Sequence, residues 1–177
     1  RALRLDVSLY EEVEHDASLN GEALRVVIFV AIIAGAGNFI DQLLALRFGS
    51  AFGVLFATII GLVLGYYIWS YVTWFVGSKL LGGTADVGEL KRTLGYAFAP
   101  QALSFFAFIP CVGGIVALAG AIWALLAGVV AVRQALDFST GKAVITVIIG
   151  WVIVMVLALI IAGIFGIGGM GLGMMAG

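Results

Sequence analysis

The longest uncharged stretch of the chain, residues 93–132, reads TLGYAFAPQALSFFAFIPCVGGIVALAGAIWALLAGVVAV. A membrane-spanning helix needs about 20 apolar residues, so this stretch can hold two spans if a tight turn separates them. The segment PCVGG at residues 110–114 supplies such a turn, because proline and glycine interrupt helices. We therefore expect one span over Leu94–Ile109 and another over Val112–Val132, in preference to a single long tilted helix.

The composition of the whole chain supports a membrane protein. Hydrophobic residues make up 63% of the 177 residues and charged residues only 11%, whereas soluble domains average about 45–50% and about 25%. Three further apolar stretches are long enough to cross a bilayer: Ala23–Ile40, Phe52–Val76 and Ala143–Gly166. The sequence predicts an all-α fold, a polytopic membrane protein built as a five-helix transmembrane bundle.

The basic residues predict the orientation of this bundle. With five spans, every Lys and Arg except Arg47 falls on the side that holds the N-terminus. Cytoplasmic loops carry the excess of Lys and Arg, so we expect a cytoplasmic N-terminus and a C-terminus outside. Aromatic residues, which favour the membrane–water boundary, crowd the cytoplasmic end of the second span: Tyr66, Tyr67, Trp69, Tyr71, Trp74 and Phe75.

Outside the expected 23–166 domain, the chain divides into a polar segment, residues 1–22, and a glycine-rich tail, residues 167–177. Apolar residues at helical spacing in the first segment predict a short N-terminal amphipathic helix on the cytoplasmic side. These residues are Leu3, Val7, Tyr10 and Val13. The opposite face is acidic and disfavours anionic headgroups, so the stripe docks either on the bundle or on a partner.

Catalytic and cofactor chemistry is not indicated. Glu12 and His15 share a helix face within the acidic segment Glu11–Asp16, but their number and spacing fit a solvated acidic surface better than a metal site. With a single histidine and a single cysteine, Cys111, the chain offers no Ser-His-Asp set and no Cys-His pair at one depth. We expect a non-enzyme without metal or cofactor, and the net charge of −1 gives no reason to expect nucleic-acid binding.

Small residues recur at every fourth position in two spans, a spacing that lets helix backbones approach closely. The second span carries Gly53, Ala57, Gly61 and Gly65, and the fourth carries Gly120, Ala124 and Gly128. Packing within the bundle is the first interpretation, and contact with another membrane protein or a second copy of the chain is the alternative.

Pro100 lies early in the third span, where it removes a helical hydrogen bond and bends the helix. The nearby Gln101 and Ser104 can satisfy a freed backbone group. Broken helices build the sites of some transporters, so Tyr96, Gln101 and Ser104 are candidates to line a cavity.

The sequence around this proline resembles a known family. Residues 80–100 read LLGGTADVGELKRTLGYAFAP, which is similar to the core of the Yip domain family, membrane proteins named for their interaction with Ypt/Rab GTPases. Gly95, Tyr96 and Pro100 match the family motif. Residues 131–143 resemble the family's loop before the last helix, and residues 6–16 the leader of prokaryotic members.

The resemblance implies five spans and, for a prokaryotic-type member, a place in the cytoplasmic membrane, but it does not set a biochemical role. We therefore expect a membrane scaffold or adaptor, such as an accessory subunit that packs against membrane lipids and other membrane proteins or itself. The alternative is a transporter or channel for a small solute or lipid that uses the helix break at Pro100.

Gly61→Leu tests the packing interpretation. A bulky side chain in a small-residue row holds helix backbones apart, so we expect the variant to lose helix association in a thermal unfolding and cross-linking assay. Normal folding and thermal stability of the variant would contradict the assignment of Gly61 to a helix interface.

Overall fold

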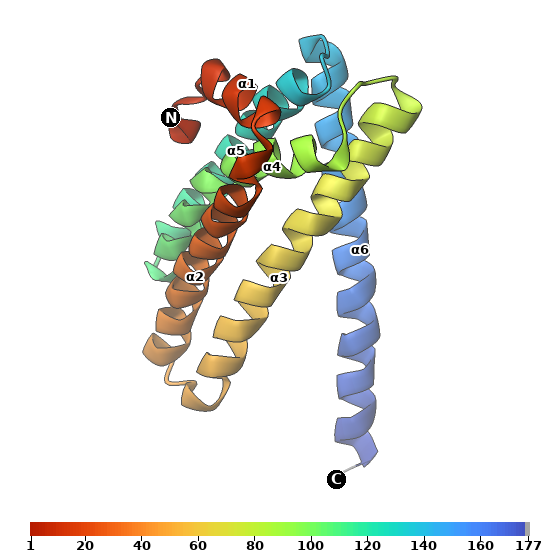
Figure 1. Ribbon diagram of the computed structural model, residues 1–177. Helices are drawn as coiled ribbons and strands as arrows, with labels where there is room; N and C mark the ends of the chain where they lie inside the picture. Colours follow the sequence, from red (N-terminus) through yellow and green to blue (C-terminus); the bar gives the residue numbers. More distant parts are fainter. Residues whose placement is uncertain (176–177) are drawn as a thin grey trace.

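The computed structural model describes the backbone of residues 1–175 and the side chains of residues 1–157, 159, 160 and 163 (Figure 1). This part of the chain is helical and contains no strand. Its α-helices are α1 (Val7–His15), α2 (Asn20–Leu44), α3 (Phe48–Trp74), α4 (Val87–Ala97), α5 (Gly113–Ala135) and α6 (Thr140–Met175). Shorter 3-10 or π segments are η1 (Ala2–Arg4), η2 (Ala17–Leu19), η3 (Phe75–Leu80) and η4 (Ala99–Phe108).

Four helical stretches are long and apolar enough to cross a membrane. They are Ala17–Leu44, Phe48–Leu80, Gly113–Ala135 and Thr140–Leu157, and they coincide with the first, second, fourth and fifth predicted spans. In Figure 1 the corresponding long helices extend to one side, and α1 and α4 lie across their other end, beside the N-terminus. The helix α6 continues through Met175, past the boundary expected at residue 166, and residues 176–177 lie outside the described residues.

The third predicted span, Leu94–Ile109, is not a continuous α-helix. The chain ends α4 at Ala97 and continues from Ala99 as the 3-10 helix η4, with Pro100 in its first turn. Proline has no N–H to donate and disfavours the α conformation of the residue before it, so the α-helix stops here. The expectation of a bent α-helix is therefore replaced by a change of helix type.

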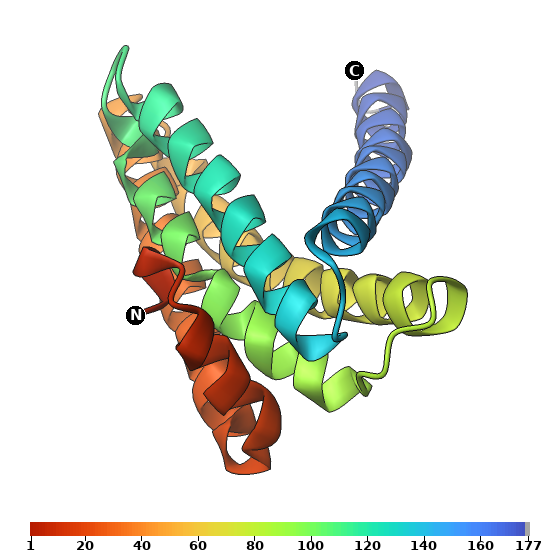
Figure 2. The same cartoon turned by 90° about the horizontal axis from the view of Figure 1, so that it is seen from above.

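The 3-10 helix η4 packs lengthwise between α2 and α5 (Figure 2). Glycines of both neighbours make room for its backbone. A Cβ added to Gly120 of α5 would lie 2.9 Å from the Pro100 carbonyl oxygen, and one added to Gly37 of α2 would collide with the Phe105 carbonyl. A side chain at either position would push η4 outward, so these glycines set the spacing of the three segments.

The helix α1 docks on α4 and α5 at the end of the bundle. Asp6 caps its N-terminus by accepting a hydrogen bond from the Ser8 N–H at 3.1 Å. Of the predicted stripe, Tyr10 and Val13 are buried, whereas Leu3 and Val7 are exposed and Leu9 is buried in their place. Burial raises the pKa of the Tyr10 phenol to about 12.

The C-terminus of α1 is bound by a buried cation, Arg92 of α4, whose exposed fraction is 5%. Its Nε donates to the Val13 carbonyl at 3.0 Å, one terminal nitrogen donates to the Glu14 carbonyl, and the other donates to Asn20 Oδ1 at 3.3 Å. The last carbonyls of a helix lack partners within the helix and carry partial negative charge. Arg92 satisfies both needs and ties α1 to α4.

Arg92→Ala should release α1 from the bundle. The substitution removes charge-assisted hydrogen bonds, which contribute about 1.5–3 kcal/mol each, and leaves the Val13 and Glu14 carbonyls without that donor. We expect faster amide hydrogen exchange across Leu9–Glu14, measured by mass spectrometry, with little change in α5. Arg25→Ala is the control, because the Arg25 guanidinium bonds the Gly21 carbonyl of its own helix; equal exchange in the two variants would contradict the role of Arg92.

Candidate functional site

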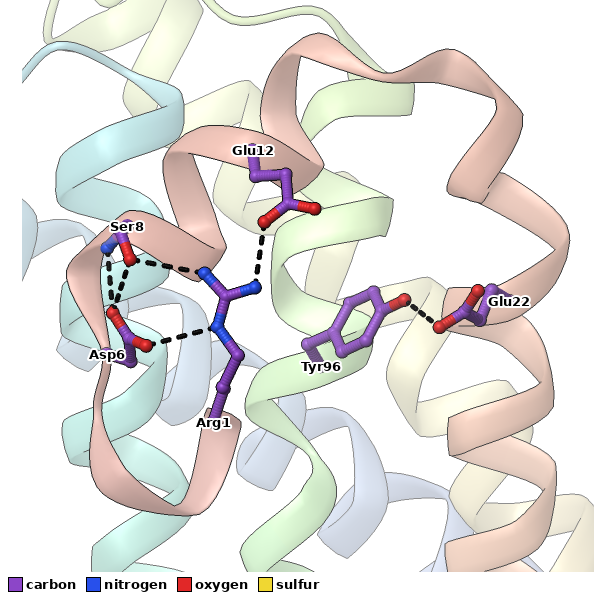
Figure 3. Close-up of polar contacts among 6 residues, drawn as sticks. All are labelled: Arg1, Asp6, Ser8, Glu12, Glu22 and Tyr96. Carbon is purple, nitrogen blue, oxygen red and sulfur yellow. Dashed lines mark hydrogen bonds and ion pairs between the residues drawn. The ribbon is translucent and has the colours of Figure 1, made fainter.

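The three residues of the family motif meet where α4 gives way to η4. Gly95 is buried against α2, where a Cβ would lie 3.0 Å from the Ala23 Cβ and 3.1 Å from its carbonyl oxygen. The Tyr96 hydroxyl donates to Glu22 of α2 at 2.7 Å (Figure 3). Pro100 is buried against α5. The motif therefore joins the break in the third segment to both of its neighbouring helices.

A cavity of about 250 Å³ lies next to this break. Its walls come from α3, α5, α6 and the α4–η4 junction, and most of them are apolar. The residues that line it are Gly61, Leu62, Gly65, Trp69, Phe98, Gln101, Ala121, Ala124, Leu125, Trp151 and Val154. Gln101 is the most polar of them, and none is ionisable. The cavity therefore suits an apolar ligand with few polar atoms.

Trp69 of α3 forms the inner wall of the cavity and links three helices. A Cβ on Gly128 of α5 would lie 2.8 Å from one edge of its indole, and a Cβ on Gly150 of α6 would lie 3.3 Å from Nε1. The Phe98 ring packs 5.8 Å from the Trp69 ring, centroid to centroid. The sequence placed Trp69 among aromatic residues at the membrane boundary, but the structure buries it in the core because the two glycines leave space for a large ring.

Two polar atoms beside this ring are buried without hydrogen-bond partners among the described residues, Trp69 Nε1 and Thr73 Oγ1. Both lie near Gly150, where a Cβ would be 2.9 Å from Thr73 Oγ1. A buried polar group without a partner destabilises the folded state. The two glycines make room for the Trp69 ring, but its position leaves these two polar atoms without hydrogen bonds, which lowers the stability of the folded state.

The two rows of small residues have different surroundings. On α5, Gly120 contacts η4, Gly128 contacts Trp69, and Ala124 is buried between them. On α3, Ala57 is exposed, and a Cβ added to Gly53, Gly61 or Gly65 would meet no atom within 4 Å. The α5 row lies inside the bundle, and the α3 row is open, so Gly61→Leu tests association with another chain more directly than folding of the monomer.

Glu12 and His15, which share a face of the acidic segment, have different partners. Glu12 accepts from Arg1 at 2.8 Å, and Asp6 accepts from the same guanidinium at 3.1 Å (Figure 3). His15 Nδ1 lies 2.9 Å from the Glu11 carbonyl oxygen, which raises the pKa of the imidazole. Within the described part of the chain, no group of three or more His, Cys, Asp or Glu side chains is arranged to hold a metal ion.

Some residues on which the arrangement depends carry weak signals in the sequence. Arg92 enters only as one of several basic residues, because its partners Val13 and Glu14 lie far from it in the sequence. Gly37 and Gly150 lie outside the two rows with a small residue at every fourth position. Their close contacts with Phe105 and Trp69 depend on which helices are neighbours, which a local pattern does not specify.

Gly120→Ala tests the contact between α5 and η4. The added methyl group would lie 2.9 Å from the Pro100 carbonyl oxygen and the Leu103 Cβ, so we expect the free energy of unfolding to fall by about 1–3 kcal/mol, the usual cost of overpacking. Gly114→Ala on the same helix meets nothing within 4 Å and serves as the control. Equal melting temperatures of the two variants in detergent would contradict the close packing of η4.

Comparison with known proteins agrees with the motif. The family model described as the Yip1 domain matches residues 8–171. No curated protein and no solved structure matches the chain. The match covers α1 from its second residue, the break at Pro100 and all four apolar helical stretches, so it includes the motif, the cavity and the contact of Arg92 with α1. The chain is a multi-pass helical membrane protein and belongs to the Yip1 domain family.

Proposed function

We propose that this protein is a non-enzymatic membrane scaffold that holds another membrane protein, or a second copy of itself, against the open face of α3. The observation that carries the proposal is the row Gly53, Ala57, Gly61 and Gly65, which is exposed over most of its length and touches no other helix at its glycines. Small-residue rows of this spacing support close helix contacts in membranes. An accessory subunit of a larger membrane complex needs such a face.

The surroundings of the row support a helical partner. Large apolar side chains of α3 flank it and are more than half exposed: Phe52, Phe56, Ile60 and Leu64. These side chains form a ridge, and the row of small residues beside it forms a groove. Two membrane helices pack closely when the ridge of each lies in the groove of the other. The neighbouring α6 contacts α3, η3 and α5, and its lower half stands away from α3 in Figure 1. A partner helix therefore has lateral access to the row.

The proposal includes the placement of the chain in the cytoplasmic membrane. The third crossing consists of α4 at the boundary and η4 below it, and together with the four apolar stretches this makes five. A 3-10 helix rises about 2.0 Å per residue, so η4 extends about 20 Å, most of the roughly 30 Å hydrocarbon core. An odd number of crossings puts the two termini on opposite sides, and the excess of Lys and Arg on the side of α1 favours a cytoplasmic N-terminus and a C-terminus outside.

Transport of a small solute or lipid is the second candidate, and the cavity beside Pro100 favours it. Of the three residues predicted to line such a cavity, Gln101 does so. Tyr96 instead bonds Glu22, and the Ser104 hydroxyl bonds the Gln101 carbonyl at 2.6 Å. Ion and proton pathways use ionisable residues inside the membrane, and none lines the cavity. The scaffold is therefore the better supported function.

Native purification in a mild detergent tests the scaffold. The wild-type protein should elute with a stoichiometric second membrane protein, or as a dimer, measured by light scattering and mass spectrometry. The double variant Gly53→Leu/Ala57→Leu should lose at least about tenfold in this association, because one close glycine contact and its neighbour are replaced by bulky side chains.

Gly114→Leu is the matched control, since Gly114 on α5 is also exposed and a Cβ there meets nothing within 4 Å. It should associate like the wild type. A wild-type protein that elutes as a lone monomer at every detergent concentration would contradict the proposal.

A further inference from the structure

The cavity beside the helix break has the form of a slot along α3. Gly61, Gly65 and Trp69 lie on one line of that helix at four-residue spacing and all line the cavity. Four residues of α-helix cover about 6 Å, so the two glycines give the slot a floor without side chains over that length, and Trp69 follows one turn further along. Trp151 and Val154 of α6 form the opposite wall.

The slot opens sideways toward the bilayer. Trp151 and the next residue, Val152, are both exposed, as are Ile60 and Leu64 of α3. The lower half of α6 diverges from the lower half of α3 in Figure 1. In a membrane, an apolar slot that opens sideways faces hydrocarbon chains, and a void there would forfeit packing contacts.

Two lining side chains of the slot have unused hydrogen-bonding capacity, the Trp69 indole N–H and the Gln101 carboxamide, and Gln101 is the more polar of the two. Its backbone N–H donates to the Phe98 carbonyl at 2.9 Å, and its carbonyl accepts from the Ser104 hydroxyl at 2.6 Å. Its carboxamide has no partner among the described residues. An unpaired amide is costly in a medium without water, so an oxygen atom that accepts from Gln101 stabilises whatever occupies the slot.

The depth of Gln101 indicates which oxygen that is. Tyr96, five residues earlier, hydrogen-bonds the exposed Glu22 at the boundary of the bundle, so Gln101, two residues after the start of η4 at Ala99, lies about 4 Å along that segment, just inside the boundary. In a glycerolipid the ester carbonyls lie just inside the headgroups, and the acyl chains continue toward the centre of the bilayer. The slot runs in the same direction, from Trp69 and Gln101 toward Gly61.

We propose that this slot binds one acyl chain of a membrane glycerolipid, with the Gln101 carboxamide donating a hydrogen bond to the ester carbonyl of that chain. The chain lies over Gly65 and Gly61, and the rings of Trp69, Phe98 and Trp151 enclose it. This site uses Gly61 and Gly65 of the α3 row, whereas Gly53 and Ala57 do not line the slot and remain open to a protein partner, so the two sites can be tested separately.

Lipid retention by the full chain, measured by native mass spectrometry in detergent, tests the site. The two probes are dioleoylphosphatidylcholine and its ether-linked counterpart, which has the same chains but no ester carbonyl. The wild type should retain the ester lipid about three- to tenfold better, the effect of one hydrogen bond. Gln101→Leu should retain the two lipids equally.

Cavity filling gives an independent measurement. Gly65→Leu should reduce retention of both lipids at least about tenfold, since it places four carbon atoms in the slot. Gly53→Leu is the matched control, because Gly53 belongs to the same row and is equally open but does not line the cavity. It should retain lipid like the wild type even where it weakens association with a partner.

Two results would overturn the proposal. One is equal retention of the ester and ether lipids by the wild type, which removes the role of Gln101. The other is unchanged retention by a folded Gly65→Leu, which shows that the lipid is only part of the surrounding shell. If Gly65→Leu does not fold, the comparison of ester and ether lipids between wild type and Gln101→Leu still decides. A loss of partner association in Gly53→Leu with intact lipid retention separates this site from the scaffold.

Discussion

Close contact between the backbone of η4 and two glycines is the constraint on which the rest of the bundle depends. Gly37 of α2 and Gly120 of α5 have no side chains where Phe105 and Pro100 pass. Because the three segments fit only at this spacing, α4 is held at the end of the bundle. From there Arg92 reaches the C-terminus of α1. The N-terminal helix, the helix break and the cavity are therefore parts of one arrangement.

The sequence predicted much of this fold and less of the site. Apolar length is a property of each segment alone, so the stretches that became α2, α3, α5 and α6 were recognisable. The effect of Pro100 was foreseen, but not the change to a 3-10 helix, because that depends on neighbours that accept a thinner segment. Likewise both small-residue rows were visible, yet only contacts between distant segments determine that the α5 row is covered and the α3 row is open.

In the interior of the bundle, an aromatic ring fills the space that glycines of neighbouring helices leave open. Trp69 occupies space left by Gly128 and Gly150 on two other helices, so a residue that the sequence assigns to the membrane boundary becomes part of the core. On α3 itself the relation is reversed, since Gly61 and Gly65 face the cavity and a Cβ added to either would meet no atom within 4 Å. The filled glycine positions thus lie on α5 and α6 and the unfilled ones on α3, and the unfilled ones are where lipid or protein can enter.

The winding of η4 also makes the length of this segment as important as its composition. Side chains three residues apart eclipse one another in a 3-10 helix, so the side chains of η4 form three rows that run along the helix like the edges of a three-sided prism. One edge carries Pro100 and Leu103 toward α5, and the next carries Gln101 and Ser104. Inserting or deleting one residue between Ala99 and Phe108 would rotate every later side chain onto a neighbouring edge. Homologous chains that keep this prism should therefore tolerate substitutions in it more readily than changes in its length.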